Sequence, residues 1–125
     1  MSDMLILGYG PAGISAALYG LRAGISVQLV GKDGGALAKA HMIQNYYGLE
    51  KPLAGEELLK VGKQQALALG AKIADDEVTD LMFDGEGFVA KGIRGNIVER
   101  PALWRRARPV TSIRLRGWPN LKDMA

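Results

Sequence analysis

The residues best suited to binding chemistry are the glycines of Gly8–Gly13, which reads Gly-Tyr-Gly-Pro-Ala-Gly. In this spacing the first glycine permits a sharp turn, the second lets the backbone approach a pyrophosphate, and the third lets a helix pack close to a strand. Pro11 falls in the first turn of the expected helix, where a missing N–H costs nothing. Free N–H groups and the helix dipole would then favour the phosphates of a dinucleotide without a lysine.

The segments around these glycines have the patterns of a βαβ unit. Residues 4–7 are apolar and predict a strand, residues 14–23 have helical spacing of apolar residues, and the β-branched residues of 25–30 predict a second strand. A glycine-rich turn can also close an ordinary strand–helix corner. Its place directly after a strand and before a helix favours dinucleotide binding.

The end of the second expected strand lacks a usual feature of such sites. An acidic residue that accepts the ribose hydroxyls should stand near position 31, where the chain has Gly31-Lys32-Asp33. Three arrangements stay open: Asp33 serves from two residues on, Lys32 meets a phosphate, or the backbone holds the ribose. A polar loop without a ligand is an equally good interpretation.

The rest of the chain up to residue 99 predicts a framework for this unit. The pattern indicates a second packing helix over 55–69, a third strand over 71–74 beside the first two, and a small antiparallel β meander of 78–83, 88–93 and 97–98. The acidic run Asp75-Asp76-Glu77 is typical of a solvated loop. The expected fold class is α/β, with a parallel sheet, two helices and the meander in a three-layer, Rossmann-like arrangement.

Composition excludes several kinds of chemistry. The 125 residues include no cysteine and a single histidine, His41, so thiol catalysis, disulfides and a zinc site are excluded. The sequence supplies no convincing acid, base or nucleophile, and we assign no catalytic residue and no metal ligand. No apolar run approaches the ~20 residues of a membrane helix, and the N-terminus lacks a secretory signal, so we expect no membrane association and a cytoplasmic location.

Four motifs in order resemble the thioredoxin reductase-like flavoproteins. Gly8–Ala17 resembles the start of that family, and Gly34–Leu37 stands where the family has Gly-Gly-Gln-Leu. Ile43–Gly48 stands where it has Ile-Glu-Asn-Tyr-Pro-Gly, and Gly55–Leu58 matches Gly-x-Glu-Leu. The resemblance covers about residues 3 to 99. It implies the N-terminal part of an FAD-binding domain of the FAD/NAD(P)-binding class.

The resemblance also implies a cofactor, partners and site residues. The cofactor is FAD, the electron donor of the full-length family is NAD(P)H or ferredoxin, and a homodimer is a further expectation. Ala36 replaces the family's Gln and Tyr47 its Pro, which leaves the donor open. Because the nicotinamide domain and the redox cysteines are missing, we expect no complete turnover from this chain, and whether it is an enzyme by itself stays open. The expected cofactor-binding residues are Gly8, Gly10, Pro11, Ala12, Gly13, Lys32, Gly35, Ala36, Leu37, Asn45 and Val78.

Charge and motif both change near Arg100. Residues 1–99 carry 9 basic and 12 acidic groups, whereas residues 100–125 carry 7 and 1. The family's strand at this point ends in Ala-Thr-Gly, which Glu99–Pro109 does not contain, although a shifted reading frame over 102–108 can encode that motif. We therefore divide the chain into 1–99, the FAD-binding part, and 100–125, an atypical basic tail that we expect to be out of frame and poorly ordered.

The alternative interpretation is a non-enzymatic nucleotide-binding module with a genuine basic arm. The arginines of the tail would then contact nucleic-acid phosphates, and Trp104 or Trp118 would stack on bases. We do not favour nucleic acid as a partner. A steep salt dependence of nucleic-acid affinity would support the arm.

Overall fold

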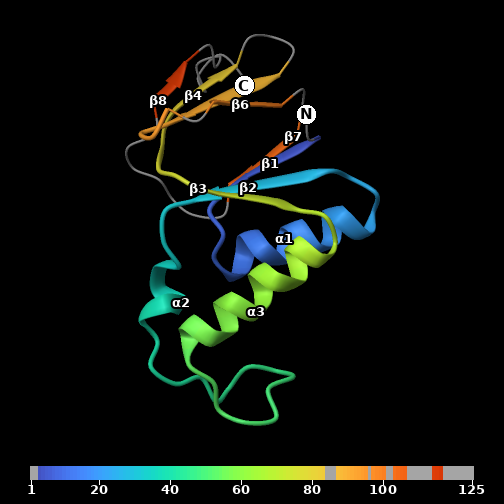
Figure 1. Ribbon diagram of the computed structural model, residues 1–125, viewed down its shortest axis with the longest axis vertical. Coiled ribbons are helices and arrows are strands. Elements are labelled where there is room, and N and C mark those ends of the chain that lie inside the picture. The colour runs from blue at the N-terminus through green and yellow to red at the C-terminus, as the bar shows by residue number, and fades with distance from the viewer. Residues whose placement is uncertain (1–2, 84–86, 96, 101–102, 107–113, 117–125) are drawn as a thin grey trace, which may run out of the picture.

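The computed structural model describes residues 3–83, 87–95, 97–100, 103–106 and 114–116 (Figure 1). The elements in chain order are β1 (Met4–Leu7), α1 (Pro11–Arg22), β2 (Val27–Gly31), α2 (Gly35–Lys39), α3 (Gly55–Ala68), β3 (Lys72–Asp75), β4 (Val78–Phe83), β5 (Phe88–Gly92), β6 (Ile97–Arg100), β7 (Leu103–Arg106) and β8 (Arg114–Arg116).

The elements form three layers. A parallel sheet with the strand order β3-β2-β1-β7 lies in the middle. Helices α1 and α3 pack against each other and cover one of its faces, and a second sheet of order β6-β5-β4-β8 stands on the other side (Figure 1). In the second sheet β4, β5 and β6 are antiparallel, whereas β8 runs parallel to β4.

Successive side chains of β1 point to opposite faces of the sheet and pack into two separate apolar clusters. Met4 and Ile6 belong to the apolar cluster under the helices, together with Ile14 of α1. Leu5 and Leu7 belong to the cluster that β1 shares with the second sheet. A strand covered on both faces must be apolar at every position, which is why the sequence of β1 shows no polar alternation.

The expected α/β class and the parallel sheet with its small meander are confirmed. Observed strand and helix boundaries differ from the expected ones by a few residues at most, because element ends are the least certain part of such a prediction. The sequence pattern does not predict α2, because Gly34 and Gly35 are poor helix formers and typical of turns. No helix in the described ranges has the length and apolar character needed to cross a membrane.

Part of the tail is described. Strand β7 pairs in parallel with β1, in the register Met4↔Leu103 to Leu7↔Arg106, and β8 pairs with β4. The rest of the region 100–125, for which the sequence predicts poor order, lies outside the described residues. The turn expected at 84–86 lies outside them as well.

Candidate functional site

The glycine turn joins the carboxyl end of β1 to the N-terminus of α1. Gly8 has a φ of 101°, a conformation that favours glycine, and its N–H donates to the carbonyl of Val30 over 2.7 Å. Gly10 is the N-cap of α1, with extended backbone and no side-chain cap, and Pro11 follows in the first turn. The first turn carries no acidic residue. The N–H groups of Ala12 and Gly13 therefore have no acceptor within the helix.

Open space lies beside this uncapped turn. A Cβ added to Gly10 would meet no heavy atom within 4 Å, and Pro11 and Ala12 are exposed. Gly13, in contrast, is buried. An anion can thus approach the backbone at Gly10 and the N–H groups behind it. The residues present fit a pyrophosphate, which is the chemistry that uncapped helix N-termini with adjacent glycines provide.

Tyr9, the variable residue between the first two glycines, is the main site residue that sequence reasoning missed. Its side chain is only 3% exposed, and its hydroxyl donates a hydrogen bond of 2.8 Å to Oδ1 of Asp75 at the end of β3. The ammonium of Lys63 lies 3.6 Å from the centre of its ring. Tyr9 thus links the glycine turn to β3 and α3. No motif signals this role, because the family pattern leaves that position unspecified.

The environment of Tyr9 makes the stability of the fold decrease as the pH rises through the alkaline range. Burial, followed by the hydrogen bond and charge of Asp75, raises the pKa of Tyr9 from 10.0 to about 12. The fold favours the neutral phenol, so its contribution is complete below pH 10 and is lost as the pH rises toward 12.

Tyr9→Phe should therefore flatten the loss of stability between pH 10 and 12. Thermal unfolding followed by circular dichroism across this pH range measures the effect, with Tyr19→Phe, an exposed tyrosine, as the control. Equal pH slopes for the wild type and Tyr9→Phe would contradict the assignment.

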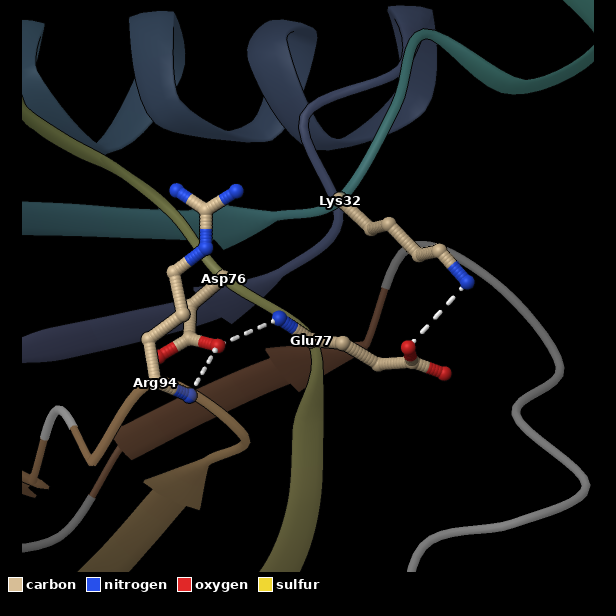
Figure 2. A network of polar contacts seen from close by, with 4 residues as sticks. All are labelled: Lys32, Asp76, Glu77 and Arg94. Carbon is tan, nitrogen blue, oxygen red and sulfur yellow. Dashed lines mark hydrogen bonds and ion pairs between the residues drawn. The ribbon is translucent and has the colours of Figure 1, made fainter.

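Lys32 and Asp33, the two polar candidates at the end of β2, are both engaged. The ammonium of Lys32 lies 3.1 Å from Oε2 of Glu77, in a pair whose side chains are 62% and 37% exposed (Figure 2). Oδ1 of Asp33 accepts a hydrogen bond of 2.9 Å from the N–H of Gly35 and so fixes the start of α2. Exposed ion pairs contribute little to stability, so Lys32 stays available to an anion at modest cost.

The interpretation of Asp75-Asp76-Glu77 as a solvated loop is wrong for Asp76. Its side chain is 3% exposed, and Oδ1 accepts hydrogen bonds from the N–H groups of Glu77 (2.7 Å) and Arg94 (3.1 Å). Figure 2 shows this carboxylate between the two backbone segments. The buried charge joins the corner between β3 and β4 to the turn after β5, a structural role that the run of three acids does not reveal.

The remaining candidates are distributed over three places. Gly35, Ala36 and Leu37 form the first turn of α2, and Asn45 is exposed in a loop that the paired backbones of Ile43 and Leu53 close. Val78 is buried at the start of β4, in the core cluster of the second sheet. Its side chain is therefore occupied in packing, which leaves only its backbone for a ligand.

A cavity of about 510 Å³ connects two of these places. Pro11 of the glycine turn and Leu37 of α2 both line it, as do residues 46–49 of the closed loop. The remaining lining side chains come from α1, α3 and the start of the loop: Ile14, Ser15, Leu18, Ile43, Leu58, Leu59, Val61, Gly62 and Gln65. Pro11 of the glycine turn thus borders a largely apolar hollow.

No metal centre is evident in the described part of the chain, where no three His, Cys, Asp or Glu side chains gather around one point. His41 is exposed. Binding at this site therefore rests on backbone N–H groups, a lysine and apolar surface.

No family model matches the chain. Among curated proteins, a thioredoxin reductase of Peptoclostridium acidaminophilum is 37% identical over 92 residues, which cover 72% of this chain and 29% of the relative. One of Peptoclostridium litorale is 32% identical over 124 residues, which cover 98% of this chain and 38% of the relative. The chain thus spans less than two fifths of the length of these relatives.

Solved structures agree with these relatives. The atypical thioredoxin reductase of Desulfovibrio vulgaris Hildenborough matches 98% of this chain with a TM-score of 0.74 and 31% identity, over 40% of its own length. The thioredoxin reductase of T. acidophilum matches 81% of this chain with a TM-score of 0.69 and 35% identity, over 33% of its own length. Over most of its residues the chain is thus thioredoxin reductase-like, similar to the N-terminal part of these oxidoreductases.

Proposed function

We propose that this thioredoxin reductase-like chain is the FAD-binding N-terminal part of a flavin-dependent oxidoreductase. The observation that carries the proposal is the uncapped N-terminus of α1 behind the turn Gly8–Gly13, with open space at Gly10. The dipole of α1 and its free N–H groups stabilise a pyrophosphate there. The similarity to thioredoxin reductases supports FAD as the dinucleotide.

Each candidate residue then has a part in binding. Gly8, Gly10, Pro11, Ala12 and Gly13 form the pyrophosphate turn, and Lys32 adds a positive charge at the same edge of the sheet. Gly35, Ala36, Leu37 and Asn45 border the flavin, and the backbone of Val78 meets the adenine. Leu37 and residues 46–49 line the same cavity as Pro11. Their position supports this cavity as the place of the flavin ring system.

Bound FAD supplies two-electron chemistry, and the residues of this chain bind and orient it. In the whole protein the electrons would come from NAD(P)H or ferredoxin. Exposed apolar side chains on the helices, Tyr19 of α1 and Leu67 of α3 among them, support pairing with a second copy. We assign no acid, base or nucleophile, so turnover is a property of the whole oxidoreductase.

A flavin titration tests the proposal. The purified 125-residue chain should bind FAD in a 1:1 ratio, with quenching of flavin fluorescence, and should not bind FMN, because FMN lacks the pyrophosphate and the adenosine. Binding of ADP without FAD would instead support a non-enzymatic nucleotide-binding module. Binding of neither FAD nor ADP would contradict a nucleotide site in this chain.

We also propose that residues 100–125 are translated out of frame, since the charge and the expected Ala-Thr-Gly motif change together at Arg100. A shifted frame that encodes this motif in verified DNA would support the proposal. An intact frame would contradict it and leave the basic arm as the alternative.

A further inference from the structure

We infer that Asp75, held in place by the hydroxyl of Tyr9, accepts hydrogen bonds from the adenosine ribose of the bound dinucleotide. The inference rests on the proposed function and adds a residue from β3 to it. In many dinucleotide sites an acidic residue at the end of β2 accepts the ribose hydroxyls, and this chain has Gly31 there. Asp75 would take over that role.

Gly31 has no room for a side chain. A Cβ at this position would lie 2.6 Å from Cε1 and 2.8 Å from Cγ of Tyr9, and in contact with Cδ1 as well. The ring of Tyr9 is buried under the turn and cannot give way cheaply. The ring of Tyr9 therefore occupies the space that an acidic side chain at position 31 would need.

The sheet register brings another carboxylate to the same place. Gly31 and Asp75 are direct partners in the pairing of β2 with β3, so Asp75 is the neighbour of the vacated position. Both strands end at the edge where the glycine turn begins, and ligands of open parallel sheets bind at that edge. Asp75 is exposed, unlike the adjacent Asp76.

Asp75 is also oriented for an acceptor role. The hydroxyl of Tyr9 donates to Oδ1 over 2.8 Å, and no other hydrogen bond to this carboxylate is found in the described part of the chain. Oδ2 can thus accept from a ribose hydroxyl, in a charge-assisted hydrogen bond. Tyr9 is a positioning residue, because it acts through Asp75.

The other acidic groups at this edge already have partners. Asp33 accepts from the N–H of Gly35, Glu77 pairs with Lys32, and Asp76 is buried with two backbone donors. Among these acidic residues, Asp75 is the direct partner of Gly31 in the sheet.

The test compares ADP with 2′,3′-dideoxy-ADP, which lacks the two ribose hydroxyls, by isothermal titration calorimetry. The wild-type chain should bind ADP about tenfold to a hundredfold more tightly than the dideoxy compound, the range expected for hydrogen bonds to a charged group. Asp75→Asn should reduce this ratio to about a few-fold without weakening the binding of dideoxy-ADP. Tyr9→Phe, which keeps the ring, should reduce the ratio by a smaller factor.

Glu77→Gln is the matched control, because it also removes one negative charge at this edge. Removing a negative charge near an anionic ligand strengthens binding, so a loss of affinity in Asp75→Asn cannot come from net charge. Glu77→Gln should keep the wild-type ratio of ADP to dideoxy-ADP affinity.

Two results separate this inference from the proposed function. If the wild-type chain binds ADP and dideoxy-ADP equally, or if Asp75→Asn keeps the wild-type ratio, the inference is overturned while the nucleotide site stands. If the wild-type chain binds neither compound, the proposed function fails and the inference with it. The wild-type comparison needs no variant, so it decides even if Asp75→Asn does not fold.

Discussion

Gly10→Ala should abolish binding of FAD and ADP while the free energy of unfolding stays unchanged or rises slightly. Gly10 has a φ of −71° and a ψ of −174°, which alanine adopts without strain, and the added methyl group would meet no atom of the chain. The methyl group would instead occupy the space through which a pyrophosphate approaches the first N–H groups of α1. Losing two charge-assisted hydrogen bonds reduces affinity by roughly a hundredfold or more.

Gly95→Ala is the matched control, since a Cβ at Gly95 also meets nothing within 4 Å. Gly95 has a φ of 82°, so alanine is strained there, and it belongs to the turn after β5 and not to the glycine turn. It should lower the melting temperature and keep nucleotide binding, the reverse of Gly10→Ala. Calorimetric titration with ADP and thermal unfolding measure both effects. Undiminished ADP affinity in Gly10→Ala would contradict the assignment of the phosphate site.

Gly92→Ala should destabilise the fold strongly, although it adds only one methyl group. Gly92 has no positive φ, so the effect is one of contact: the new Cβ would press against the carboxylate of Asp76. Displacing that carboxylate breaks the hydrogen bonds that it accepts from the backbone N–H groups of Glu77 and Arg94. The expected cost is about 3–5 kcal/mol, which lowers the melting temperature by roughly 10 °C or more.

A double variant identifies the cause. In Asp76→Ala the carboxylate is already gone, so adding Gly92→Ala should cost little more, and the two changes should be strongly non-additive. Thermal and urea unfolding of the two single variants and the double variant give the coupling energy. Additive costs would show that the methyl group at position 92 acts on something other than Asp76.

The βαβ unit could be predicted because its signals are local. The glycines of the turn, Pro11 and the apolar run of β1 each act within a few residues, and they define both the turn and the helix start. The short helix α2 could not be predicted, because Gly34 and Gly35 favour turns. The carboxylate of Asp33 fixes the start of α2, whereas the sequence pattern favours a ligand or a polar loop for it.

What could not be predicted depends on pairing between distant segments. Gly31 lies beside Asp75 because of the register in which β2 pairs with β3. No sequence motif encodes that register. The role of Tyr9 is invisible in the sequence because its partners lie on β3 and α3. The burial of Asp76, one acid among three, depends on a turn 18 residues further along the chain.

The position of β1 inside its sheet has a consequence during synthesis of the chain. Strand β1 pairs with β2 on one side and with β7 on the other, and β7 begins about a hundred residues after β1. At ribosomal rates of about 5–20 residues per second, the apolar segment Met-Leu-Ile-Leu has one open backbone edge for roughly 5–20 s. An open apolar strand edge invites pairing with another nascent chain or capture by a chaperone. Yield on expression should therefore depend on synthesis speed and temperature as much as on the stability of the finished fold.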